Sequence, residues 1–272
     1  GLSASFLAAL AFWAGIPWAL KMPIGHLVDL IWRWKGWLVS LGAGLIATSL
    51  LIMVGLIGSR AAMTAILPAE AWYVISVLLA PIGYVIQDTV ADAMTVEAVP
   101  RVDDQGQPFD EPTRKLMHTT MQTLGRVAVV GGSILVALIN LYLFTGVEGL
   151  PQDAVAQIYR NVYLLALAIP AVSVLGVLSA ALVALRDKRR LLQQGMTKQQ
   201  VHALLNERGE PTTPNWWILG GSLLFVLFTL TVGFSDFLYN EEIVFIGSLG
   251  IVSFLIFRLT RELAPESRHV LL

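Results

Sequence analysis

Apolar residues in this chain gather into long stretches, and most of the charged residues lie between them. Seven such stretches occur, at 2–20, 37–58, 71–98, 117–145, 161–185, 216–234 and 242–258. A helix of about 20 apolar residues crosses the roughly 30 Å hydrocarbon core of a bilayer. The pattern therefore predicts an all-α, polytopic membrane helical bundle with about seven transmembrane helices.

Lysine and arginine are concentrated in every second connection between these stretches. Most of them lie in 21–36, 99–116, 186–214 and the tail after 257, whereas 59–70, 146–160 and 235–241 hold only Arg60 and Arg160. Basic connections of membrane proteins stay in the cytoplasm. We therefore expect an integral, multi-pass protein of a bacterial inner membrane, or of a thylakoid or intracytoplasmic membrane, with the 186–214 connection cytoplasmic.

The composition narrows the classes of function. Apolar residues make up 56% of the chain and charged residues 14%, against roughly 25% charged residues in a soluble domain. The net charge of −1 offers no basic face for nucleic acid, so the lipid bilayer is the expected partner. The chain has no Cys, and its four His residues (His26, His118, His202 and His269) lack metal-ligand spacing. Since no catalytic motif occurs either, we expect no enzyme, no metal and no cofactor.

The longest connection, 186–214, separates five spans from two. It opens with the basic sequence RDKRR, and Thr197 and Gln200 then have the spacing of a helix capping box. Apolar residues follow on one helix face, and Gly209 is a natural helix end. A short amphipathic helix on the cytoplasmic side and a plain linker both fit this sequence. The predicted domains are an N-terminal bundle at 1–185, a central loop at 186–214 and the start of a second bundle at 215–272.

Acidic residues occur in the third apolar stretch, within YVIQDTVADAMTVEAVP. Asp88 and Asp92 are four residues apart and share a helix face, whereas Glu97 lies on the opposite side. If the membrane boundary is near residue 100, Asp88 is about 18 Å deep and Asp92 about 12 Å deep at ~1.5 Å per residue. Arg126 in the next span is about 16 Å deep, so we expect it to be the counter-charge of this acidic pair.

Three interpretations of these acids remain open. They can form a structural ion pair that fixes the packing of two helices. They can line a polar cavity in which a carboxylate binds a proton or a substrate cation, as ionisable residues within a membrane often do. Alternatively, the third span ends before Asp88, because 71–87 is just long enough to cross the bilayer, and the acids then lie in solvent.

The first basic connection, 21–36, predicts a tight cytoplasmic turn. Gly25 allows close approach of the backbone, and Asp29 can cap a helix or pair with Arg33. Arg33 and Lys35 lie among three tryptophans, which favour the membrane interface. In the fourth stretch Gly125, Gly131 and Gly132 would permit close contact between helices, although glycine is common in membrane spans.

The sequence GHLVD, with Gly25 and Asp29, resembles the cytoplasmic loop signature of the major facilitator superfamily, G-x-L-x-D-(R)-x-G-(R)-(R/K). Leu30 stands where that signature has Arg, and the basic residues Arg33 and Lys35 are displaced along the loop. The resemblance implies a partial major-facilitator fold in which the first stretch is the second of twelve spans. The chain would then cover spans two to eight, as a fragment of a longer protein, and Gly25, Asp29, Arg33 and Lys35 would form a gating loop.

The sequence DTVADAMTVE resembles the acidic signature D-x-x-x-D-x-x-V-V-E of the folate–biopterin transporter family within that superfamily, with Thr95 in place of the first Val. The resemblance covers roughly residues 13–132. It implies secondary active transport of a small organic anion such as a folate or pterin, with protons as symported ions and alternating access as the mechanism. It also implies that the substrate and proton pathway includes Asp88, Asp92, Arg126 and Glu97.

A related branch of the superfamily shares this pattern of spans and assembles light-harvesting complexes. The alternative function is therefore a non-transporting subunit that helps to assemble a photosynthetic membrane complex or delivers pigment to it. Its partner would be the larger membrane complex. The buried acids favour transport, because a lipidic pigment needs fewer charges.

Overall fold

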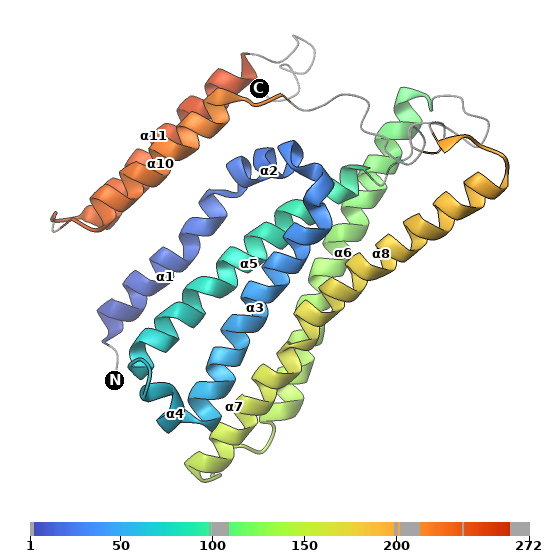
Figure 1. Ribbon diagram of the computed structural model, residues 1–272. Helices are drawn as coiled ribbons and strands as arrows, with labels where there is room; N and C mark the ends of the chain where they lie inside the picture. The colour runs from blue at the N-terminus through green and yellow to red at the C-terminus, as the bar shows by residue number, and fades with distance from the viewer. Residues whose placement is uncertain are drawn as a thin grey trace. The chain divides into compact units, whose positions relative to one another are not determined.

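The structure, a computed structural model, describes residues 3–97, 99, 109–198, 201, 213–235 and 237–261. Within these residues the regular elements are all helices (Figure 1). The chain divides into two compact units, residues 1–21 with 31–209 and residues 22–30 with 210–272. The prediction of an all-α helical bundle is confirmed.

The first unit contains α1 (Ala4–Ala19), α3 (Lys35–Gly58), α4 (Arg60–Thr64), α5 (Ala69–Glu97), α6 (Glu111–Phe144), α7 (Gln152–Ala166) and α8 (Ala168–Gln193), with a 3-10 turn at Trp32–Trp34. The second unit contains residues 22–30 of α2 (Lys21–Leu30), together with α10 (Trp216–Gly233) and α11 (Asn240–Thr260). Seven helical segments among the described residues are long and apolar enough to cross a membrane. They coincide with the seven predicted stretches, so the prediction of a multi-pass membrane protein is supported.

Helices extend further than the hydropathy predicts. The prediction of a tight turn at 21–36 is wrong, because α2 and the 3-10 turn occupy most of this connection. Likewise α6 begins before residue 117, and α8 continues through RDKRR to Gln193. Arg, Lys, Glu, Leu and Gln are all good helix formers, so a helix need not end where its apolar stretch ends. The predicted helix within 197–209 lies outside the described residues, except for Thr197, Lys198 and Val201.

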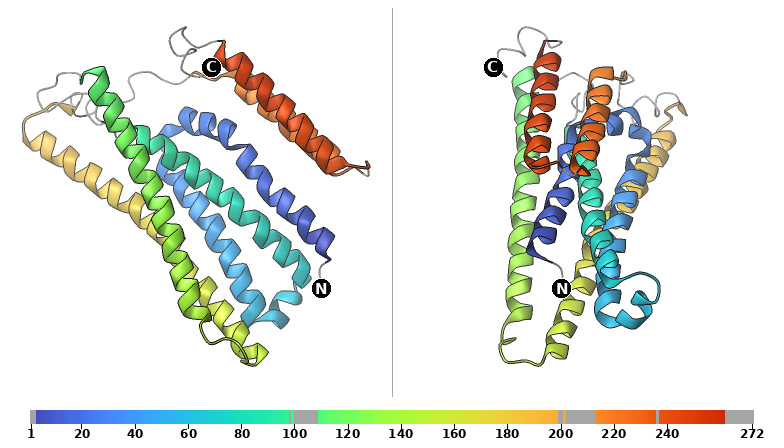
Figure 2. Two further views of the ribbon diagram at one scale, coloured as in Figure 1. Left: turned by 180° about the vertical axis from the view of Figure 1, so that it is seen from behind. Right: turned by 90° about the vertical axis from the view of Figure 1, so that its left-hand side faces the viewer.

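The core of the first unit is the contact between α3 and α5. Helix α3 packs on α5 and also on α7 and α8, while α1 packs along α5, so that α1, α5 and α3 lie side by side (Figure 2). Gly42 and Gly83 face each other where α3 and α5 cross. A Cβ built on Gly83 would lie 2.6 Å from the carbonyl oxygen of Gly42. The absence of two side chains thus allows the two backbones to touch.

Polar side chains join the same two helices on either side of this crossing. Ser49 and Ser76 are both buried, and each hydroxyl lies within hydrogen-bond distance of the other residue's carbonyl oxygen, at 2.8 and 3.0 Å. Gln87 donates from Nε2 to the carbonyl oxygen of Val39 at 3.1 Å. Buried polar groups in a membrane protein need such partners, so these contacts fix the register of α5 on α3.

The glycines of α6 make no comparable contact. A Cβ at Gly125, Gly131 or Gly132 would find nothing within 4 Å. The expectation that these three glycines permit close helix contact is wrong in this structure. The close approach occurs at Gly42 and Gly83, and the sequence does not distinguish these from the other glycines of the spans.

In the second unit α10 and α11 form an antiparallel hairpin, and α2 is tied to its start. A Cβ at Gly221 of α10 would lie 2.5 Å from Leu255 of α11, so these helices are also in close contact. Asn215 is the N-cap of α10, and its backbone N–H donates to Nε2 of His26 on α2 at 2.8 Å. This hydrogen bond joins two segments that are far apart in the sequence.

The N-cap of α6 gives a prediction about pH. Hydrogen bonds from the side chain and the backbone N–H of Thr113 lower the pKa of Asp110 below its ordinary value of 3.8. Because the folded-state pKa is the lower one, the cap stabilises α6 fully above about pH 4, and this contribution is lost as the pH falls through the lowered pKa. We expect Asp110→Asn, which keeps a capping oxygen without the titrating proton, to lose less stability on acidification than the wild type. Thermal unfolding measured at neutral and acidic pH tests this, and equal losses would contradict it.

Candidate functional site

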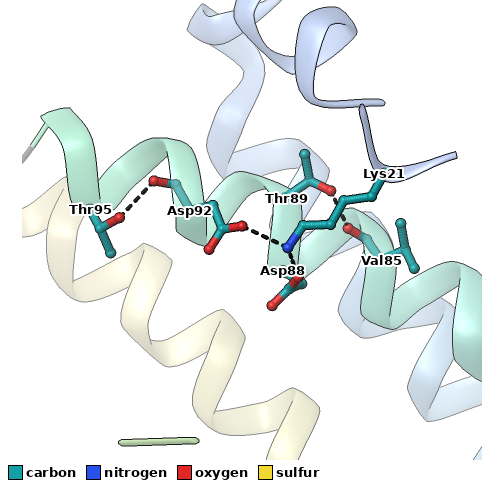
Figure 3. A network of polar contacts seen from close by, with 6 residues as sticks. All are labelled: Lys21, Val85, Asp88, Thr89, Asp92 and Thr95. Carbon is teal, nitrogen blue, oxygen red and sulfur yellow. Dashed lines mark hydrogen bonds and ion pairs between the residues drawn. The ribbon is translucent and has the colours of Figure 1, made fainter. Parts of the chain in front are cut away.

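The two acids of α5 share a single lysine. Lys21, the first residue of α2, directly follows α1 in the first unit. Its Nζ lies 2.5 Å from Oδ2 of Asp88 and 2.7 Å from Oδ2 of Asp92 (Figure 3). These three residues, called the charge cluster below, carry two negative charges and one positive charge. The cluster therefore holds one carboxylate charge that Lys21 does not neutralise.

The geometry of the cluster follows from the helices that carry it. Asp88 and Asp92 are one turn apart on α5, so one ammonium group can reach both. The neighbouring positions Val85, Thr89 and Val90 are buried, which holds α5 in a fixed rotation. The Thr89 hydroxyl donates to the carbonyl oxygen of Val85 at 2.6 Å and so leaves the carboxylates to Lys21.

The cluster is only partly covered by protein. The side chains of Lys21 and Asp88 are 38% and 39% exposed, and that of Asp92 is 64% exposed. An ion pair this accessible contributes at most about 1 kcal/mol in water, and more where lipid excludes water. Both carboxylates are therefore accessible at the surface of the first unit.

Arg126 is not the partner that the sequence analysis expects. It lies on α6 with its side chain exposed, and in the part of the chain that the structure describes it has no carboxylate partner. The expectation rested on the third and fourth spans being consecutive. The structure instead places α1 against α5, and Lys21 at the end of α1 reaches the acids.

A signal for Lys21 was present in the sequence. The first and third spans run in the same direction across the membrane, so their ends after residues 20 and 98 lie on the same side. Lys21 ends the first stretch and the acids approach the end of the third. The sequence does not show that these two spans are neighbours, so it does not predict the contact between Lys21 and the acids.

The predicted gating residues lie in α2, in the 3-10 turn and at the first residue of α3. Gly25 and Asp29 lie within α2. Arg33 lies in the 3-10 turn and Lys35 begins α3. The Arg33 guanidinium is 5.6 Å from the ring centroid of Trp34, and the Lys35 ammonium is 4.4 Å from that of Trp32. These are cation–π contacts.

Two parts of the predicted site stay predictions. They are the pairing of Asp29 with Arg33 and the gating role of this loop. Glu97 is the last residue of α5, and its side chain lies outside the described residues.

No cluster suited to binding a metal is found where the structure describes the chain. Among the described residues no group of three or more His, Asp or Glu side chains could hold a metal ion. The charge cluster itself contains two carboxylates and a lysine, and a lysine ammonium has no lone pair to offer a metal. Carboxylate oxygens are acceptors and an ammonium group is a donor, so this site presents two acceptor groups beside one donor group.

No family model, curated protein or solved structure matches this chain.

Proposed function

We propose that the chain is part of a secondary active transporter that carries folate- or pterin-like organic anions with protons by alternating access. The observation that carries the proposal is the charge cluster, which joins two apolar helices through two carboxylates and one lysine. Charged residues are rare in such helices, and where they occur they commonly belong to ion or proton pathways. The resemblance of DTVADAMTVE to the folate–biopterin transporters supplies the class of substrate.

The cluster suggests how a proton couples to movement. Protonation of Asp88 or Asp92 would weaken the hold of Lys21, because a neutral carboxyl attracts an ammonium group far less than a carboxylate does. Lys21 links the end of α1 to α5, so its release would loosen the two helices at that end. For protonation to drive a conformational change, the protein must bind the proton more tightly in one of its two transport conformations than in the other.

The anionic substrate requires a cation elsewhere. Lys21 is engaged by two carboxylates, whereas Arg126 has no carboxylate partner within the described residues. Arginine binds carboxylates through two parallel hydrogen bonds. In this proposal Arg126 therefore binds the substrate, and the charge cluster binds the proton.

The test is uptake of labelled folate by the intact protein in proteoliposomes, with and without an imposed pH gradient. One proton per substrate and a gradient of one pH unit can drive about tenfold accumulation. We expect accumulation that disappears when a protonophore collapses the gradient. A folded protein that takes up neither folate nor a pterin under any gradient would refute the proposal for this substrate class.

The alternative function, a non-transporting subunit of a photosynthetic membrane complex, would need a surface that contacts other membrane proteins. Helix α6 has no buried residue, although much of it is apolar. Such a surface would contact lipid or another membrane protein. Copurification of a larger complex or of a coloured pigment, together with absent uptake, is the result expected for that function.

A further inference from the structure

The first half of α6 carries a second polar site, separate from the charge cluster. A groove of about 650 Å³ is lined there by Glu111, Arg114, Lys115, His118, Thr119 and Gln122, together with Val99 beyond the end of α5. The α6 residues recur at intervals of three and four and therefore share one side of the helix. They were not selected in the sequence analysis, because each is unremarkable by itself.

The chemistry of the groove suits a phosphate. Arg114 and Lys115 provide two positive charges, and His118 and Gln122 add N–H donors in any protonation state. Glu111 is the single carboxylate among the lining residues. An arginine fork and a lysine beside it form a common arrangement for binding phosphate oxygens.

The position along α6 places the groove at the level of lipid headgroups. A bilayer of about 40–45 Å, headgroup layers included, takes about 27–30 residues of helix, so a span that ends at Phe144 begins near residues 114–117. Arg114 and Lys115 then lie at the outer edge of the headgroup layer, and His118 and Gln122 lie deeper in the membrane.

An apolar surface accompanies the groove. Val129 and Val136 lie five helical turns after Glu111 and His118, on the same side of α6 as the groove, and they are 69% and 46% exposed. Acyl chains could therefore lie along α6 while the headgroup lies in the groove. A soluble phosphate would use only the polar part of this surface.

We propose that this groove is a binding site for the phosphate headgroup of an anionic phospholipid, with Arg114 and Lys115 as the phosphate ligands. The proposal does not depend on transport, and it applies equally to the alternative function. In this proposal the basic residues of the connection 99–116 have two roles: they set the orientation of the spans in the membrane, and they bind a specific lipid headgroup.

The test compares lipids bound to the purified full chain after detergent delipidation. Phosphatidylglycerol and phosphatidylcholine are added separately, and native mass spectrometry gives the bound fraction of each. The test variant is Arg114→Gln/Lys115→Gln, and the matched control is Arg60→Gln/Lys188→Gln, which removes the same charge outside the groove. A charge-conserving variant, Arg114→Lys/Lys115→Arg, checks that the substitutions are tolerated.

We expect the wild type to prefer phosphatidylglycerol. Each basic residue near an anionic surface contributes about a fivefold factor in affinity, so the test variant should lose roughly 25-fold. The matched control and the charge-conserving variant should stay close to the wild type. Equal losses in the test and control variants, or no loss in the test variant, would overturn the proposal.

A competition with glycerol phosphate separates the lipid from a free phosphate. Glycerol phosphate presents the headgroup chemistry without acyl chains. We expect it to displace phosphatidylglycerol poorly even in large excess. Efficient displacement would overturn the lipid as the ligand and assign the groove to a soluble phosphate compound.

Discussion

Asp88→Asn is expected to reduce substrate uptake to the level of empty liposomes while leaving membrane insertion intact. The substitution conserves the shape of the side chain and removes its charge, so the charge cluster becomes neutral and can no longer exchange a proton at this position. Uptake of labelled folate under a pH gradient measures the effect. Asp153→Asn is the matched control, because Asp153 is exposed in the first turn of α7 and lies outside the cluster.

A second set of variants separates a transport role from a structural one. Lys21→Gln leaves two carboxylates without their cation, and Asp88→Asn leaves one carboxylate for Lys21. Suppose that the cluster only holds α1 to α5. The double variant Lys21→Gln/Asp88→Asn should then take up more substrate than Lys21→Gln alone, because it no longer has two carboxylates that repel each other. If Asp88 carries the proton, the double variant stays inactive. Normal uptake by both Asp88→Asn and Asp92→Asn would contradict the transport role of the cluster.

The spans could be predicted from the sequence because the bilayer itself sets the length of an apolar helix. All seven predicted stretches correspond to helices, and α5 at Ala69–Glu97 closely matches the predicted 71–98. Helix ends were harder to predict. At 186–193 the polar residues are mostly good helix formers, so the helix continues where the apolar stretch ends.

The candidate site could be predicted only in part. Helical periodicity places Asp88 and Asp92 on one face of α5, and the structure confirms that they act on the same partner. Periodicity does not identify which helix faces them, so the sequence predicts Arg126 on the consecutive helix, whereas the structure shows Lys21. The groove on α6 was not predicted either, although helical spacing by itself places its six α6 residues on one side of the helix.

Gly83→Ala is expected to cause the largest loss of stability among single substitutions of small residues. The new Cβ would lie 2.6 Å from the carbonyl oxygen of Gly42, 2.8 Å from Cγ1 of Ile46 and 3.2 Å from the Ile46 nitrogen. Two of these three atoms belong to the backbone of α3, so the clash cannot be relieved by rotating a side chain. The helices must separate, which also weakens the Ser49–Ser76 hydrogen bonds.

Overpacking of this kind costs typically 1–3 kcal/mol and occasionally more, and about 3 kcal/mol corresponds to a fall in Tm of roughly 5–10 °C for a protein of this size. Thermal unfolding in detergent micelles measures it. Gly131→Ala on α6 is the matched control, because nothing lies within 4 Å of its added Cβ. Alanine is the better helix former by up to about 1 kcal/mol, so the control should be neutral or slightly stabilised.

The reciprocal substitution shows whether the crossing itself is responsible. A Cβ at Gly42 would lie 2.8 Å from the carbonyl oxygen of Gly83 and 2.7 Å from Cγ of Gln87, so Gly42→Ala should also destabilise the protein. Once one alanine has separated the helices, the second has less contact left to break. The double variant should therefore lose less than the sum of the two single losses. Two results would mean that the contact between α3 and α5 does not limit stability. They are fully additive losses in the double variant, or equal shifts in Tm for Gly83→Ala and Gly131→Ala.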